Sequence, residues 1–187
     1  MDKEQFYQMR LHRDTFESQK IERDTNFSFK VIDNNNPLHI RDNISDIKFI
    51  CKSIAKELPD WEGKPALDIS LERLNSISSL LLFYHKDFNK AIGWGWCSDV
   101  LTYDWINKVH QLPTDNSYYF GGVYIQKNLD LPPNTGFQLY YQALSYFYSK
   151  YEWGYGYMDK WNRASILICY KLGGERYNFI DDYGREY

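Results

Sequence analysis

One continuous stretch, residues 117–151, constrains the fold of this chain more than any other. It opens with a bulky run that favours a β-strand, Tyr118–Ile125, interrupted only by Gly121 and Gly122. A polar loop with two prolines follows over Gln126–Thr135. Large apolar side chains then recur with the spacing of one face of an amphipathic helix. These side chains are Phe137, Tyr140, Tyr141, Leu144, Phe147, Tyr148 and Tyr151.

The junction between this strand and this helix has a chemical meaning. Asn134 or Thr135 can cap the helix, and Gly136 keeps its first turn free of a side chain. The first N–H groups of a helix have no partner within the helix and point at whatever lies at its start. A strand, a loop and a helix N-terminus can therefore bind an anion, although the same unit is more often plain scaffolding.

Composition places the chain among globular proteins of a reducing compartment. A length of 187 residues suits one well-buried domain, and 43% hydrophobic with 25% charged residues is typical of a soluble fold. A net charge of −3 argues against general nucleic-acid binding, which needs a basic face. No signal-peptide pattern and no apolar run of ~18 residues occurs, so we expect no membrane span. Three cysteines at irregular spacing favour a cytoplasmic location.

The remaining segments predict one α/β domain over residues 27–187, preceded by an N-terminal arm or short helix over residues 1–26. Asp42 or Asn43 is the expected cap of the first long helix, whose apolar stripe contains Cys51 as a core residue. Other strands are predicted at 27–32, 80–84, 91–97, 153–159 and after Gly174, and other helices at about 44–58, from about 65, and at 164–172. Gly93 and Gly95 indicate either tight sheet packing or close approach of a ligand.

Two segments carry a resemblance to a known family. Asn162-Arg163-Ala164-Ser165-Ile166, followed by Leu172-Gly173, is similar to the late-helix signature of the GCN5-related N-acetyltransferases. In that family an Asn-x-x-Ala/Ser-Ile segment leads to Leu-Gly-Phe, and the spacing from Asn162 to Gly173 needs no gap. Val123-Tyr124-Ile125, a loop and then Gly136 resemble the family's acyl-CoA segment. The resemblance covers roughly residues 27–183.

The resemblance implies an α/β fold with a mixed, mostly antiparallel central sheet and helices on both faces. It implies that strands 118–126 and 153–159 splay apart and that the pantetheine arm of acetyl-CoA lies between them. The reaction implied is direct attack of a small-molecule or peptide amine on the thioester, without a metal. The oligomeric state stays open, with a homodimer as one candidate.

The same resemblance assigns roles to residues of this chain. Backbone groups of Val123, Tyr124 and Ile125 would hold the pantetheine arm and polarise the thioester carbonyl, an oxyanion-hole role. The cofactor site would include Asn162 at the start of the late helix. N–H groups at the helix start would bind the pyrophosphate, and they belong to Asn134, Thr135, Gly136, Phe137 and Gln138.

Three positions depart from the family pattern. Asp130 lies near the place where the family usually has Arg or Gln, so its carboxylate must face away from a bound pyrophosphate. Cys169 occupies the position of the Tyr that protonates the leaving sulfur, and Tyr170 follows it ~100° round the helix. Position favours Cys169 as the acid, whereas intrinsic chemistry favours Tyr170. Gly174 replaces the usual Phe.

The general base is the weakest part of the sequence prediction. Asp99, Asp115 and Asp159 are the candidates, and each is more readily explained as a turn or strand-end residue. Three functions therefore remain open at this stage. The leading one is an N-acetyltransferase that uses acetyl-CoA. The others are a binding module that keeps the fold without catalysis, and an acyltransferase whose donor is an acyl-carrier protein.

Overall fold

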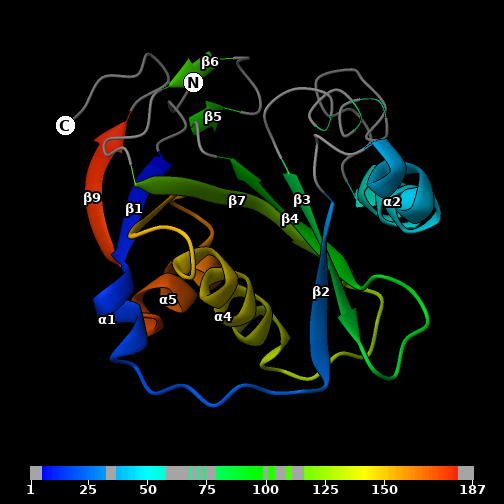
Figure 1. Ribbon diagram of the computed structural model, residues 1–187, viewed down its shortest axis with the longest axis horizontal. Coiled ribbons are helices and arrows are strands. Elements are labelled where there is room, and N and C mark those ends of the chain that lie inside the picture. Colours follow the sequence, from blue (N-terminus) through cyan, green and yellow to red (C-terminus); the bar gives the residue numbers. More distant parts are fainter. Residues whose placement is uncertain are drawn as a thin grey trace.

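A seven-stranded sheet forms the centre of the computed structural model, with the strand order β2-β3-β4-β7-β8-β1-β9 (Figure 1). The structure describes residues 6–32, 37–57, 68, 71, 74, 79–98, 101–103, 108–110 and 116–180. The strands of this sheet are β1 (Phe6–His12), β2 (Phe27–Ile32), β3 (Ser79–His85), β4 (Gly93–Ser98), β7 (Ser117–Ile125), β8 (Trp153–Asp159) and β9 (Glu175–Ile180). Two short strands, β5 (Leu101–Tyr103) and β6 (Lys108–His110), pair with each other in a separate ribbon.

Helices cover both faces of this sheet, and its strands are mostly antiparallel. The helices are α1 (Arg13–Glu17), α2 (Pro37–Glu57), α4 (Thr135–Tyr148) and α5 (Arg163–Lys171). Helix α2 lies on one face, and α4 and α5 lie on the other (Figure 1). Strands β7 and β8 run parallel, whereas the other neighbouring strands of the sheet run antiparallel. The predicted mixed α/β sheet is confirmed.

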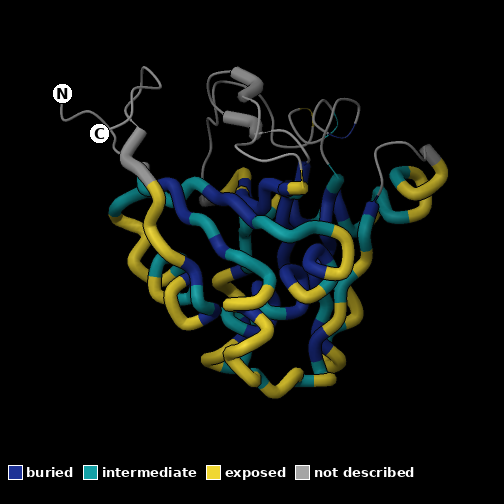
Figure 2. The backbone as a smooth tube through the Cα atoms, turned by 60° about the vertical axis from the view of Figure 1, so that its left-hand side comes forward, coloured by how far each residue is buried: buried dark blue, intermediate teal, exposed yellow. Residues whose placement is uncertain are grey.

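Strand β3 separates two hydrophobic cores. Leu81 and Phe83 pack with α4, while Leu80 and Leu82 pack with α2, and all four are fully buried. An unbroken apolar run is what a strand needs when both of its faces are covered. Figure 2 shows the buried residues gathered in the centre of the molecule and the exposed ones on its outer turns.

The N-terminal segment departs most from the sequence prediction. Residues 6–12 are not an arm or a helix but strand β1, which lies between β8 and β9 and pairs antiparallel with both. Met9 and Leu11 are buried, while Arg10 between them reaches over the Trp153 ring of β8. This alternation is that of a strand. The sequence predicted an arm or a short helix here because a real helix, α1, follows directly after β1 and buries Phe16.

Most other predicted elements are present. Strands 27–32 and 153–159 are confirmed, and the helix predicted at 164–172 is α5. Helix α2 begins earlier than expected, at Pro37, because proline suits the first turn, where its missing N–H costs nothing. The helix predicted from about residue 65 lies outside the described residues except at 68, 71 and 74. No described helix combines the length and the apolar character needed to cross a membrane.

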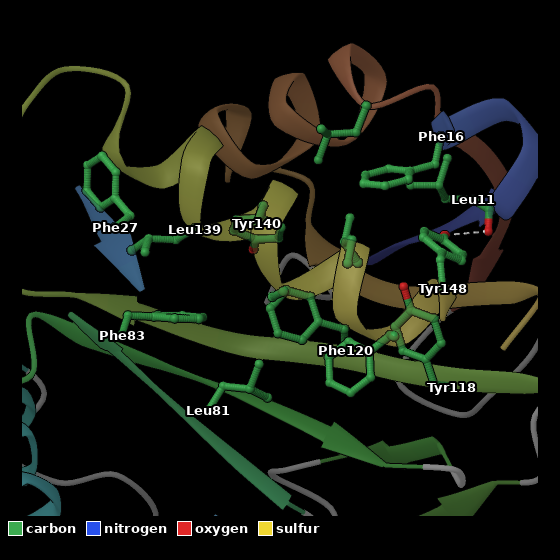
Figure 3. Packing of buried hydrophobic residues seen from close by; sticks show 14 of the residues in the cluster. Leu11, Phe16, Phe27, Leu81, Phe83, Tyr118, Phe120, Leu139, Tyr140 and Tyr148 are labelled. Carbon is green, nitrogen blue, oxygen red and sulfur yellow. Dashed lines mark hydrogen bonds between the residues drawn. The ribbon is translucent and has the colours of Figure 1, made fainter. Parts of the chain in front are cut away.

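A buried hydrogen bond joins α4 to β1 and gives the first prediction. Tyr148 Oη donates to the Leu11 carbonyl at 2.8 Å (Figure 3). Tyr148→Phe should lower the free energy of unfolding by about 0.5–1.5 kcal/mol, because one buried hydrogen bond to the Leu11 carbonyl is lost. Tyr146→Phe is the control, since Tyr146 Oη accepts from Lys150 Nζ at the surface. Equal melting temperatures for the two variants would show that this bond does not hold β1 in place.

Candidate functional site

Strands β7 and β8 pair only where they begin. The paired residues are Ser117 with Trp153, Tyr118 with Gly154, and Tyr119 with Tyr155. Strand β7 then continues to Ile125 and β8 to Asp159 without pairing to each other. The expected splay is therefore present, and it opens next to Phe120, the first residue of β7 beyond the paired segment.

A bulge in β7 accounts for this separation. Trp94 lies opposite Tyr124 and Trp96 lies opposite Gly121, so two steps along β4 match three along β7. The residue left over falls in a segment where Gly122 has a φ of 57°. Glycine adopts this left-handed conformation without the steric penalty of a Cβ. A bulge increases local twist and bends its strand, which turns β7 away from β8.

The backbone of β7 beyond the bulge presents alternate residues to the gap. Gln126 N–H donates to the Ile92 carbonyl at 2.9 Å. Hydrogen-bonded and non-bonded pairs alternate in an antiparallel ladder, so Tyr124, opposite Trp94, also directs its N–H and C=O at β4. Val123 and Ile125 therefore direct theirs at the gap. Of the three residues predicted to hold a pantetheine arm, these two have backbone groups facing the right side.

The start of α4 has two unpaired donors. Thr135 N–H and Oγ1 both donate to the Pro132 carbonyl, at 3.0 and 2.7 Å, and Gln138 N–H donates to the Asn134 carbonyl at 3.0 Å. In the part of the chain that the structure describes, the N–H groups of Gly136 and Phe137 have no hydrogen-bond partner. These two N–H groups can bind an anion, and the partial positive charge of the helix start adds to their attraction.

Two other residues predicted at this helix start have structural roles. Asn134 is the N-cap by position, but its side chain makes no capping hydrogen bond. The Gln138 side chain is buried, where its Oε1 accepts from Asp24 N–H at 3.0 Å and its Nε2 donates to the Glu22 carbonyl at 3.1 Å. Gln138 thereby fixes the segment that leads into β2.

The start of α4, the end of β7 and the middle of α5 meet at one point. A Cβ placed on Gly136 would lie 3.3 Å from Ile168 Cδ1 and 3.6 Å from Ile125 Cδ1. The unpaired N–H groups therefore adjoin the far end of the gap. The Asp130 side chain is exposed.

Helix α5 places the two predicted acids on different sides. Asn162 is its N-cap, and Asn162 Oδ1 accepts from Ser165 N–H at 3.2 Å, which confirms the predicted cap. Cys169 is 8% exposed, whereas Tyr170 is 48% exposed. Successive helical residues point ~100° apart, so the ungapped spacing from Asn162 directs Cys169 inward and Tyr170 outward.

Two of the departures from the family pattern are coupled by packing. Cys169 Sγ lies against Gly174, where a Cβ would overlap with the sulfur. A glycine at position 174 therefore makes room for the buried thiol. Burial raises the pKa of Cys169 to about 12, so the thiol is neutral at physiological pH.

A small cavity lies beside Cys169 and is lined by three tyrosines. The sequence predicted these tyrosines only as part of a strand and of a helix face. Tyr118, Tyr140 and Tyr148 border this half-open cavity together with Gly156 of β8, and its volume is about 30 Å³. This volume is enough for one or two water molecules. The Tyr118 hydroxyl is buried close to the Tyr148 hydroxyl, and burial raises the pKa of Tyr118. The hint in the sequence was the abundance of tyrosine, since these rings carry polar tips.

Within the described residues, none of the predicted bases lies at the gap. Asp159 Oδ1 accepts from Trp161 N–H at 2.7 Å, so it stabilises the turn before α5. Asp99 and Asp115 lie outside the described residues. Among the residues that are described, no group of three His, Cys, Asp or Glu could hold a metal ion.

Comparison with known proteins gives a fold but no close relative. No protein-family model and no curated protein matches the chain. One similar solved structure is a tandem GNAT protein from the clavulanic acid pathway, with 12% identity, a TM-score of 0.58, and coverage of 96% of this chain and 52% of that one. Another is a putative GNAT-family acetyltransferase from Novosphingobium aromaticivorans, with 9% identity, a TM-score of 0.56, and coverage of 94% and 61%.

A third similar structure is an aminoglycoside acetyltransferase from an uncultured soil sample, in complex with sisomicin. It has 16% identity, a TM-score of 0.50, and coverage of 81% of this chain and 90% of that one. The chain spans 59%, 52% and 48% of the length of the first three structures that it matches. The fold is that of the GCN5-related N-acetyltransferases, as the sequence resemblance implied.

The coupling between Cys169 and Gly174 can be measured. Gly174→Ala should destabilise the protein by about 1–3 kcal/mol, because the new methyl group overpacks against Sγ. In a Cys169→Ala background the same change should cost less, because the sulfur is gone. Denaturant unfolding of both single variants and the double variant gives the coupling energy, expected at about 0.5 kcal/mol or more. Strict additivity would mean that the two residues do not constrain each other.

Proposed function

We propose that this chain is an N-acyltransferase that moves an acetyl group from acetyl-CoA to a primary amine. The observation that carries the proposal is the edge of β7 that faces away from β4 and, beyond Tyr119, does not pair with β8. A loop joins this segment to the free N–H groups at the start of α4. An extended ligand with amides along its length and a pyrophosphate at its end matches this arrangement. The GNAT fold of the chain supports the same reaction class.

The ligand would be held by groups of three kinds. Backbone groups of Val123 and Ile125 would pair with the pantetheine amides, as one strand pairs with the next. The N–H groups of Gly136 and Phe137 would bind the pyrophosphate. A backbone N–H beside the bulge would hold the thioester oxygen as it gains negative charge, a contribution worth about 3–4 kcal/mol in other enzymes.

The chemistry requires little beyond positioning. The amine attacks the thioester carbon directly, so the protein must align two reactants, accept a proton from the amine and return one to the leaving sulfur. An acetyltransferase of the same fold is known in complex with the amine-bearing compound sisomicin, which supports a small-molecule amine as acceptor here. The alternative is a binding module, favoured by the absence of a base at the gap among the described residues.

Binding of the donor is the first test. Acetyl-CoA at ~100 times its dissociation constant should add about 2.7 kcal/mol to the free energy of unfolding. For a chain of this size the melting temperature should rise by roughly 5–10 °C. Differential scanning fluorimetry with acetyl-CoA, CoA and ATP separates a specific effect from a general anion effect. No shift with millimolar acetyl-CoA would contradict the proposal.

The helix start provides a second test. Gly136→Val should weaken CoA binding at least tenfold in calorimetry, since the new side chain fills the space between the N–H donors, Ile125 and Ile168. Ser145→Val is the matched control, because it adds the same side chain on an exposed turn of the same helix. Asp130→Arg should tighten binding modestly through added positive charge. Equal affinity in Gly136→Val and wild type would place the pyrophosphate elsewhere.

A further inference from the structure

The cavity beside Cys169 owes its volume to two glycines of β8. Gly154 and Gly156 alternate with aromatic residues along this strand, so both glycines belong to the same face of the sheet. That face is the one covered by α4, because a Cβ placed on Gly154 would lie 2.9 Å from Tyr148 Oη. Side chains at these two positions would occupy the space that the cavity now takes up, and the sequence predicted their alternation with aromatic residues only as a strand.

This cavity lies at the closed end of the gap between β7 and β8. Its lining includes Phe120, the first residue of β7 beyond the paired segment, and Gly156, which follows the last paired residue of β8. A Cβ placed on Gly156 would lie 3.0 Å from the Phe120 carbonyl oxygen, so the two strands are still close together at this level. Figure 3 shows Phe120 in the layer between the sheet and α4.

A pantetheine arm bound as proposed above would run toward this cavity. Its pyrophosphate end would lie at the start of α4, which adjoins Ile125. From Ile125 the open edge of β7 leads back to Phe120, next to the segment that pairs with β8. An extended ligand on this edge therefore carries its acyl group to Phe120 and Gly156. The acyl chain cannot continue in the plane of the sheet, because Tyr119 and Tyr155 are already paired there.

The end of the acyl chain must then turn toward one face of the sheet. On the face away from α4, the rings of Tyr119 and Tyr155 are buried and form a cluster of their own. On the face toward α4 the cavity begins, with Phe120, Gly156 and Cys169 in its lining. The space available to the chain is therefore on the side of α4 and α5.

We propose that this cavity receives the end of the acyl chain, and that the donor carries a saturated, unbranched acyl group one or two carbons longer than acetyl. Propionyl-CoA and butyryl-CoA are such donors. This inference rests on the proposed function and specifies its donor. A volume of about 30 Å³ holds about two atoms or groups the size of a water molecule, such as methylene groups. The four additional carbons of hexanoyl-CoA exceed this volume.

The polar groups that border the cavity are uncharged or engaged with the protein. Tyr148 Oη donates to the Leu11 carbonyl at 2.8 Å, and Tyr140 Oη lies 3.5 Å from Ser165 Oγ. Burial raises the pKa of the Cys169 thiol to about 12, so this thiol carries no charge at neutral pH. Such a lining suits hydrocarbon, which needs no hydrogen-bond partner.

A dicarboxylic acyl group such as succinyl would need a cation near its far end. Of the described residues that line the cavity, Arg10 alone is a cation. It alternates along β1 with Met9 and Leu11, which also line the cavity, so its side chain points to the opposite face. Its guanidinium binds Glu175 Oε1 at 2.6 Å and lies 4.5 Å from the centre of the Tyr177 ring. The cavity therefore discriminates against a charged acyl end.

The test measures the dissociation constants of a series of acyl-CoA thioesters by calorimetry, without an amine acceptor and so without turnover. Burial of each additional CH₂ should tighten binding about fourfold, so butyryl-CoA should bind on the order of tenfold more tightly than acetyl-CoA. Hexanoyl-CoA should bind more weakly than butyryl-CoA because its chain exceeds the cavity. Succinyl-CoA should also bind more weakly than butyryl-CoA, because its carboxylate would lose water without gaining a cation.

A pair of leucine variants locates the acyl chain. Leu144 lines the cavity from α4, so Leu144→Ala should enlarge it and let hexanoyl-CoA bind at least as tightly as butyryl-CoA. Leu139→Ala is the matched control, because Leu139 is a buried leucine of the same helix outside the cavity lining. The control should keep the wild-type order of affinities. The wild-type series decides the inference even where Leu144→Ala does not fold.

The possible failures are distinguishable. Wild type that binds acetyl-CoA as tightly as propionyl-CoA and butyryl-CoA, or more tightly, would overturn the inference and leave the proposed function intact. An equal gain for hexanoyl-CoA in Leu139→Ala and Leu144→Ala would place the acyl chain elsewhere and overturn the inference as well. A wild type that binds neither CoA nor any of its thioesters would overturn the proposed function, and the inference with it.

Discussion

The end of pairing between β7 and β8 after Tyr119 is the constraint on which the rest of the site depends. A strand that leaves its neighbour exposes backbone donors and acceptors, and burying such groups without hydrogen-bond partners costs free energy. In this chain the cause is a bulge at Gly122 that bends β7 while its ladder to β4 continues. One edge of β7 is therefore saturated by β4, and the other is open for a ligand that can act as a strand.

The surroundings of the gap show how substitutions compensate one another. A small Gly174 accommodates the Cys169 sulfur, and Cys169 lines a cavity together with aromatic side chains from α4 and β7. Strand β1 borders the same region, because the Leu11 carbonyl accepts a hydrogen bond from Tyr148 Oη and Met9 lines the cavity. An N-terminal segment far away in sequence thus contributes to the lining of this cavity.

Local patterns in the sequence predicted what depends on local physics. Strand β7, its loop and α4 were predictable because period-two and period-3.6 patterns adjoin there. Strand β1 was not predictable, because its alternation is short and its partners β8 and β9 are remote in sequence. The bulge depends on register against β4, and the position of Tyr140 depends on packing against Phe120. Both are tertiary properties that one sequence does not display.

The central claim is that the open edge of β7 and the start of α4 together bind acyl-CoA. Residue-resolved amide hydrogen exchange by NMR, with and without CoA, tests it most directly. The account predicts new protection at the amides of Val123 or Ile125 and at Gly136 and Phe137. Tyr124, whose amide already faces β4, should change little and serves as an internal reference. Bound CoA that leaves the amides of Val123, Ile125, Gly136 and Phe137 all unprotected would contradict the account.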